Sequence, residues 1–261
     1  MRSGLASLVI GVLLTGLSTA LQAAPEPPLR FVTEPFPPYT YASQGKAAGP
    51  MVDVLQAVCA QLKRACQIEV LPWRRALAMA ERGEVDGIFT VSNTAERRQH
   101  FHISVPVIDA RYTLFAQAGE DFRLGADRQQ LKGRTIGVYG PSGTAIALDE
   151  LIAGVPDVSK QVEPDNITVL RKLAAGRYGH EGLALLNEAV ALELIRSENL
   201  AGLQAAGTIK QFSYAFGLSR SRVTPEEARR FDAVLHALCS SGRTAALLKP
   251  YALPASACRA R

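Results

Sequence analysis

The chain has 261 residues, of which 48% are hydrophobic and 20% charged, and its formal net charge is +5 at pH 7. This length and composition suffice for one large domain or two medium ones with a sizeable core. The basic residues are scattered, and no Lys/Arg-rich run of the kind that follows a phosphate backbone occurs, which argues against a nucleic-acid partner.

The N-terminal residues have the order typical of a secretory signal peptide. Arg2 gives a positive start, Leu8 to Leu21 is an apolar run without charge, and small residues follow. The alternative is a membrane anchor, but a spanning helix needs roughly 20 residues, and this run has about 14. We expect residues 1–23 to be removed on export, with Ala23 cleaved off last, and the mature protein to be periplasmic.

Short apolar, β-branched runs alternate with longer helical patterns along the chain. In the first half the sequence predicts strands at 29–33, 67–71 and 87–91, and helices at 51–64 and 73–82. One face of the first helix carries apolar residues, namely Val52, Val54, Leu55, Val58, Cys59 and Leu62. This β-α-β-α-β order is typical of a parallel sheet covered by helices.

The pattern restarts after residue 111. Strands are expected at 112–117, 135–139 and 182–186, with helices at 143–151 and 165–175, the second capped by Asp165. Near the C-terminus, Thr224-Pro225-Glu226-Glu227 combines a threonine cap, a proline in the first turn and a glutamate three residues after the cap. These residues predict the start of a helix that runs to about residue 240.

Two similar α/β halves predict an α/β fold with two lobes joined by two crossover strands. The first part of lobe 1 would comprise residues 24–113, lobe 2 residues 114–213, and the C-terminal part of lobe 1 residues 214–261. The segments 112–117 and 212–219 would carry the chain across and back. Open α/β sheets bind ligands beyond the C-terminal ends of their strands, so two facing lobes would form a cleft that can close like a hinge.

Four cysteines lie in the part of the chain expected to be exported. An even number in an oxidising compartment indicates two disulfides, although four cysteines allow three pairings. Closeness in sequence favours Cys59–Cys66 and Cys239–Cys258. A zinc site is the alternative, but the spacings contain no CxxC unit and the histidines are distant. We therefore expect no metal.

Several motifs occur in one order along the chain. They are FPPY at 36–39, GPMVDV at 49–54, GEVDG at 83–87, and TAERR at 94–98 followed by Phe101 and by SVP at 104–106. Over nearly the whole mature chain, this order and spacing resembles the extracellular solute-binding protein family 3, the polar-amino-acid binders of ABC importers. The resemblance implies a two-lobed periplasmic binding protein type II fold. The Cys59/Cys66 pair also looks like a disulfide found in some members.

Arg97 is the first candidate ligand contact. The resemblance implies that the arginine of the T-x-x-R segment grips the ligand's carboxylate, and a guanidinium fork matches that group with two parallel charge-assisted bonds. A solvated surface arginine is the alternative. The second contact is expected at Ser142, Gly143 and Thr144, where a strand turns into a helix whose N-terminal N–H groups attract negative charge. For Thr144 an ordinary helix cap is equally compatible with the sequence.

Four further residues match ligand-binding positions of the family. Thr90 and Ser92, at the end of a predicted strand, correspond to positions that bind polar groups. Phe36 and Trp73 correspond to two aromatic positions that sandwich the ligand side chain, where flat apolar faces exclude water and favour stacked or cationic groups. The alternative for Phe36 is a core residue behind the Pro-Pro turn.

Asn187 is a departure from the family pattern. Many members place an aspartate at the matching position to receive the ligand's α-ammonium group. An asparagine accepts a hydrogen bond but supplies no negative charge, so either Glu188 substitutes for it or the ligand lacks a standard amino-acid head. The expectation of a small carboxylate ligand is unaffected.

The resemblance implies a monomeric, non-enzymatic substrate-binding protein of an ABC importer. Such a protein binds a small amino acid or related carboxylate without a cofactor and delivers it to an inner-membrane permease. The alternative is a periplasmic lyase of the cyclohexadienyl-dehydratase type that acts on a small carboxylate in the same cleft. In that case Glu181 or Glu188 would serve as a general acid or base.

Overall fold

The structure is a computed structural model that describes residues 26–257. The signal peptide expected at 1–23 and the cysteine at 258 lie outside these residues. Within the described range, no helix is both long and apolar enough to cross a membrane.

A mixed nine-stranded sheet runs through the molecule. Along it the strands follow the order β4-β1-β5-β11-β7-β10-β8-β9, and β6 also pairs with β11. The bounds of these strands are β1 Leu29–Thr33, β4 Cys66–Val70, β5 Gly87–Ser92, β6 Phe101–Ile103, β7 Ile108–Gln117, β8 Thr135–Tyr139, β9 Ser159–Glu163, β10 Leu183–Asn187 and β11 Leu203–Ser219. At one end β4, β1 and β5 are parallel, and at the other β10, β8 and β9 are parallel.

Helices cover both faces at each end of this sheet. Their bounds are α1 Pro50–Leu62, α2 Trp73–Glu81, α3 Ala95–His100, α4 Gly143–Ile152, α5 Asn166–Ala174, α6 Glu188–Ser197, α7 Pro225–Ser240 and α8 Arg243–Leu248, with short 3₁₀ turns at Arg128–Leu131 and Lys249–Tyr251. Consecutive side chains of a strand point to opposite faces. Accordingly, Phe31 and Val32 belong to two separate apolar clusters, and so do Leu185 and Leu186.

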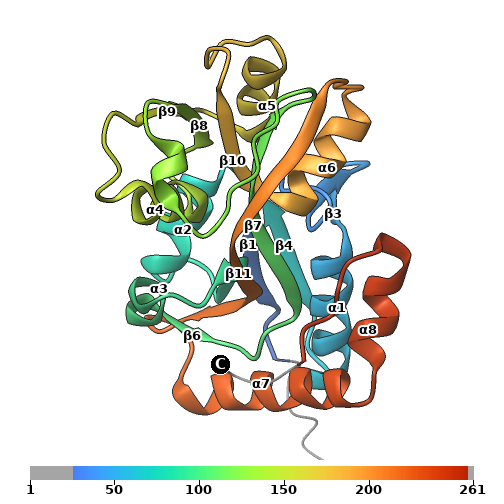
Figure 1. The fold of residues 1–261 in the computed structure, drawn as a ribbon. Coiled ribbons are helices and arrows are strands. Elements are labelled where there is room, and N and C mark those ends of the chain that lie inside the picture. The colour runs from blue at the N-terminus through green and yellow to red at the C-terminus, as the bar shows by residue number, and fades with distance from the viewer. Residues whose placement is uncertain (1–25, 258–261) are drawn as a thin grey trace, which may run out of the picture.

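The four apolar clusters define two lobes. Lobe 1 contains β1, β4 and β5 with α1, α7 and α8 on one face and α2 on the other, and lobe 2 contains β8, β9 and β10 with α4 on one face and α5 and α6 on the other. The long strands β7 and β11 pair antiparallel and run from one lobe to the other (Figure 1). The segments expected to cross between the lobes lie within these two strands, and the two-lobed α/β architecture is confirmed.

Local sequence signals account for the starts of α7 and α5. Thr224 and Glu227 form a complete capping box at α7, and Asp165 caps α5 through the N–H of Thr168. All six residues expected on the apolar face of α1 are buried.

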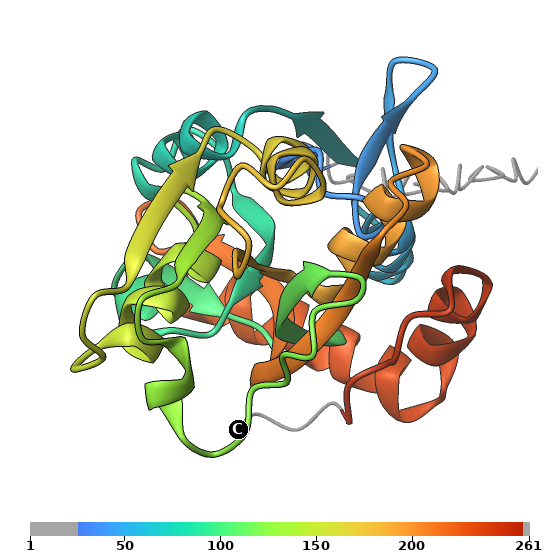
Figure 2. The ribbon, with the colours of Figure 1, turned by 45° about the horizontal axis from the view of Figure 1, so that its top comes forward.

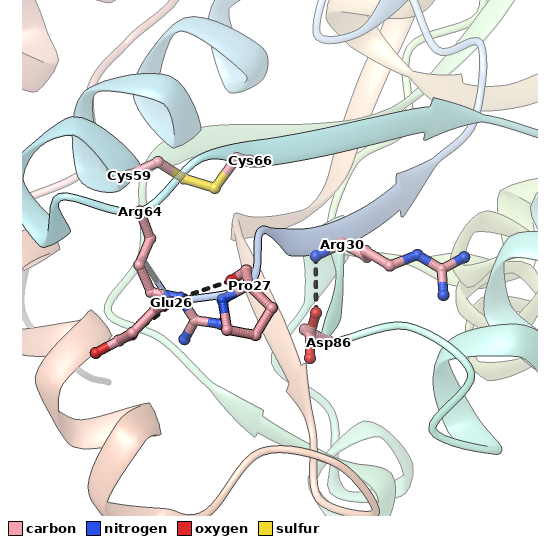
Figure 3. Close-up of a disulfide and its surroundings, with 7 residues drawn as sticks. All are labelled: Glu26, Pro27, Arg30, Cys59, Arg64, Cys66 and Asp86. Carbon is pink, nitrogen blue, oxygen red and sulfur yellow. Dashed lines mark hydrogen bonds and ion pairs between the residues drawn. A yellow bond between two sulfur atoms is a disulfide. The ribbon is translucent and has the colours of Figure 1, made fainter. Parts of the chain in front are cut away.

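The disulfide between Cys59 and Cys66 joins the end of α1 to β4, as expected from the spacing (Figure 3). Within this connection, Arg64 Nη2 donates to the carbonyl oxygen of Pro27 at 2.8 Å, and Arg64 Nε lies 3.2 Å from a carboxylate oxygen of Glu26. The α1–β4 connection therefore also holds the segment that leads into β1. The Cys239–Cys258 pair includes a residue outside the described range and stays a prediction.

Several elements were not expected from the sequence. A hairpin of β2 (Tyr41–Ser43) and β3 (Lys46–Ala48) projects from the body beside α6 (Figure 2). The edge strand β9 and the helices α3, α6 and α8 were also missed, and β11 begins nine residues before the predicted segment at 212.

Candidate functional site

A small cavity of about 60 Å³ lies between the lobes. Eight of the nine residues expected to bind ligand line it, namely Phe36, Trp73, Thr90, Ser92 and Arg97 from lobe 1, and Ser142, Gly143 and Thr144 from lobe 2. The ninth, Asn187, does not. Two larger hollows of about 460 and 410 Å³ share walls with this cavity, one along β11 and one beside Phe36 and Trp73.

Arg97 projects from the short helix α3, which begins at the Thr94 cap. Its side chain is only 15% exposed, which argues against a solvated surface arginine. The guanidinium donates to Glu81 Oε1 at 2.9 Å and lies 5.8 Å from the centre of the Trp73 ring. These two contacts fix the side chain and leave further N–H groups of the fork available, because a guanidinium carries five donors.

The start of α4 faces the same cavity from lobe 2. Ser142 caps this helix, since its hydroxyl oxygen accepts from the N–H of Ala145 at 3.2 Å. The first N–H groups of a helix have no acceptor within it, so those of Gly143 and Thr144, which line the cavity, are free of helical partners, and such groups attract anions. A Cβ on Gly143 would lie 2.7 Å from the hydroxyl oxygen of Tyr112. Only glycine therefore permits this close approach.

Thr90 has an unusual conformation at the end of β5. It falls between Phe89 and Val91 at a bulge in the pairing with β11 and has a φ of 65°, which is rare for a β-branched residue. Within the described part of the chain, its buried Oγ1 has no hydrogen-bond partner. A buried hydroxyl without a partner costs about 1–3 kcal/mol, and a polar group of a solute in the cavity would satisfy it. Ser92, two residues on, also lines the cavity.

Phe36 and Trp73 supply apolar walls. Trp73 is the first residue of α2 and is half-buried. Phe36 stacks on Tyr39 at a centroid distance of 5.5 Å and packs edge-on against Tyr214 at 5.9 Å. Phe36 is thus both a core residue and a cavity wall, so the two alternatives for this residue do not exclude each other.

Glu34 lines the cavity and was missed by the sequence analysis. It follows β1 directly and is half-buried, and no ion pair or side-chain hydrogen bond of its carboxyl occurs among residues 26–257. Burial raises the pKa of Glu34 from its ordinary value of 4.5 to about 8. The carboxyl is thus largely protonated at neutral pH. The Thr33-Glu34 sequence at a predicted strand end was the available signal, because ligands bind at such ends.

Asn187 lies elsewhere. It is 1% exposed, caps α6, and is hydrogen bonded to the hydroxyls of Tyr39 and Tyr214. The two glutamates considered as catalytic groups do not line the cavity either. Glu188 pairs with Arg111 at 2.5 Å, and Glu181 is an exposed residue 3.9 Å from Arg134.

The family model of the bacterial extracellular solute-binding proteins, family 3, matches residues 29–254. The chain belongs to this family. The match covers both lobes and both crossover strands, in agreement with the order of motifs along the sequence.

Solved structures share the fold. An ancestral arginine-binding protein bound to arginine has a TM-score of 0.75 at 19% identity, covering 87% of this chain and 99% of that chain. A histidine kinase sensor domain with similarity to periplasmic binding proteins has a TM-score of 0.75 at 20% identity, and the match covers 88% of this chain and 98% of that chain. The arginine-, lysine-, histidine-binding protein ArtJ from Geobacillus stearothermophilus has a TM-score of 0.72 at 23% identity, and the match covers 86% of this chain and 95% of that chain. At these identities the likeness establishes the fold alone.

Proposed function

We propose that this protein is the periplasmic substrate-binding component of an ABC importer and that it holds a small carboxylate solute related to amino acids. One observation carries the proposal. The Arg97 guanidinium on lobe 1 and the N-terminus of α4 on lobe 2 line the same cavity. An acid group placed there would bond to both lobes at once. A solute that contacts both lobes binds the closed form more tightly than the open form and therefore favours closure. The closed form is what a membrane permease would recognise.

Glu34 extends the proposal to a second group of the solute. Its carboxyl shares the cavity wall with Phe36, Trp73 and Tyr139. A carboxylate beside aromatic faces favours a cationic group. Because burial raises the pKa of Glu34 to about 8, binding of an ammonium or guanidinium group near neutral pH would release a proton. We therefore propose a solute with a carboxylate at Arg97 and a positive group at Glu34.

The test is a thermal-shift screen over amino acids, guanidino acids, small carboxylates and polyamines, followed by calorimetric titration of the compounds that stabilise the protein. A charge-assisted hydrogen bond contributes about 1.5–3 kcal/mol, so Arg97→Ala should weaken carboxylate binding at least tenfold. The control is Arg82→Ala, which removes an exposed arginine outside the cavity and should leave the dissociation constant unchanged. An Arg97→Ala variant that binds like the wild type would contradict the proposal.

One observation favours a second candidate, a periplasmic lyase. A carboxyl group held protonated near neutral pH in a cleft is suited to act as a general acid, and Glu34 meets that description. Mass spectrometry of the protein with the stabilising compounds separates the two functions. Unmodified adducts support the receptor, whereas loss of water or CO₂ from the compound, abolished in Glu34→Gln, supports the lyase.

A further inference from the structure

Asn187 ends β10 and caps α6, and both its amide oxygen and its amide nitrogen are hydrogen bonded to protein groups. Its Oδ1 accepts from the N–H of Val190 at 3.1 Å and from the hydroxyl of Tyr39 at 3.1 Å, and its Nδ2 donates to the hydroxyl of Tyr214 at 3.2 Å. An amide oxygen has two lone pairs, and both are occupied here. Asn187 therefore has no acceptor left for a solute.

These hydrogen bonds connect the two lobes. Asn187 belongs to β10 of lobe 2, whereas Tyr39 follows β1 of lobe 1 and Tyr214 lies where β11 pairs with β5 of lobe 1. The two tyrosine rings pack against each other at a centroid distance of 5.1 Å, and both are almost completely buried. One lobe 2 amide is thus bonded to two lobe 1 hydroxyls in a buried environment.

The first turn of α6 adds apolar and ionic contacts at the same place. Val190 is 1% exposed and belongs to the apolar cluster of lobe 1 that includes Phe36 and Tyr39. Glu188 pairs with Arg111 on the crossover strand β7. The start of α6 is therefore packed into the other lobe.

The network also reaches the cavity. The hydroxyl of Tyr112 on β7 interacts with the side chains of Tyr214 and Thr144. Burial raises the pKa of Tyr39 and Tyr214 above the ordinary phenol value and that of Tyr112 to about 12, so the hydroxyls keep their protons at any physiological pH. Polar interactions thus link the start of α4, through Tyr112 and Tyr214 on the two crossover strands, to Asn187 at the lobe interface.

We infer that Asn187 is a positioning residue that latches lobe 2 onto lobe 1 and thereby sets the fraction of molecules in the closed form. Each contact of the latch joins two protein groups, so the latch acts without a solute. The apparent affinity for any solute that needs the closed form scales with the fraction already closed. The inference goes beyond the proposed function, because it concerns lobe closure whatever solute is bound.

The test measures closure in the solute-free protein by single-molecule FRET. No described cysteine is free, so dyes can be attached to cysteines introduced at the exposed residues Gln61 of lobe 1 and Lys132 of lobe 2. We expect a closed population in the wild type. Tyr39→Phe deletes one hydroxyl and keeps the ring. Because one neutral hydrogen bond contributes about 0.5–1.5 kcal/mol, the closed-to-open ratio should fall about two- to tenfold.

Two further variants make the test specific. Asn187→Ser keeps a capping hydroxyl for α6, but its shorter side chain does not reach the tyrosines, so it should open the protein further than Tyr39→Phe. The matched control is Tyr178→Phe, which deletes a buried hydroxyl bonded at 3.2 Å to Glu163 within lobe 2. It should lower the melting temperature without changing the FRET distribution.

The inference is overturned if the solute-free wild type is already open, if neither Tyr39→Phe nor Asn187→Ser changes the distribution, or if Tyr178→Phe opens the protein equally. Arg82→Ala, which removes an exposed arginine outside the cavity, should leave the solute-free distribution unchanged. The FRET measurement without solute therefore tests the Asn187 contacts, and the solute titration tests the proposed carboxylate site. A negative result in one experiment can be told apart from a negative result in the other.

Discussion

The residues of the cavity have properties that folding alone does not favour. Thr90 has a left-handed backbone conformation and a buried hydroxyl without a partner in the described chain, and Glu34 is a half-buried carboxyl beside aromatic rings. Each feature costs stability. Such residues gather where a protein binds something, because a ligand can supply the missing partners.

Glu34 should make stability depend on pH in a defined direction. Its pKa in the folded protein is about 8, above its ordinary value of 4.5, so the folded state holds a proton that the unfolded state has lost. The contribution of Glu34 to the free energy of unfolding therefore falls as pH rises between those two pKa values. Glu34→Gln should remove this fall, and the variant should gain melting temperature relative to the wild type from pH 5 to pH 8.

Thermal unfolding of both proteins across that range measures the effect. Glu69→Gln changes an exposed glutamate on β4 and is the control. A difference between Glu34→Gln and the wild type that stays constant with pH would contradict the assignment of a raised pKa.

The placement of residues at the cavity was predictable where a motif carried it. Arg97 and Thr144 belong to short segments with fixed spacing, and the cavity contains both. Glu34 carries no such motif, and Tyr139, which lines the cavity with it, lies about a hundred positions away in the sequence. The Asn187 network likewise joins side chains from three distant segments. Interactions of this kind have no signal in local sequence.

At the scale of elements, the disulfide gives the most direct prediction. It closes a loop across a sequence separation of seven residues, and the chain-entropy estimate for such a loop is about 2.5 kcal/mol of stabilisation. The double variant Cys59→Ser/Cys66→Ser should lose about that free energy of unfolding in urea denaturation.

Because the α1–β4 connection lies in lobe 1, the loss of stability in the double variant should be confined to lobe 1. Arg64 links the α1–β4 connection to the chain that enters β1 (Figure 3), so hydrogen exchange should quicken in β1 and β4 and stay unchanged in lobe 2. Equal stability of the two proteins in urea would show that the disulfide contributes nothing.

Elements with strong local signals were predicted well, and those without them were missed. The caps at Thr224 and Asp165 locate α7 and α5 to within a residue. The edge strand β9 has the polar sequence Ser-Lys-Gln-Val-Glu and is recognisable only through its pairing with β8. Helix α6 follows β10 without a glycine or proline between them, because Asn187 both ends the strand and caps the helix.

At the scale of the whole molecule, the arrangement of two lobes on one continuous sheet explains how the lobes can move relative to each other around a cleft. Among residues 26–257, only β7 and β11 run along the sheet between the lobes (Figure 1). Each lobe has apolar clusters on both faces of its part of the sheet. A rotation about the two strands therefore leaves most of both cores intact, whereas Val190 at the start of α6 would leave the apolar cluster of lobe 1. The alternation of strands and helices predicted this architecture, whereas the closeness of the lobes depends on side-chain contacts that periodicity does not reveal.

The most direct test of the central claim is a crystal structure of the protein with the carboxylate compound that binds most tightly in the screen. The carboxylate should accept hydrogen bonds from the Arg97 guanidinium and from the N–H groups of Gly143 and Thr144, with both lobes in contact with the compound. A carboxylate bound away from these groups, or an Arg97 side chain directed into bulk solvent, would contradict the account.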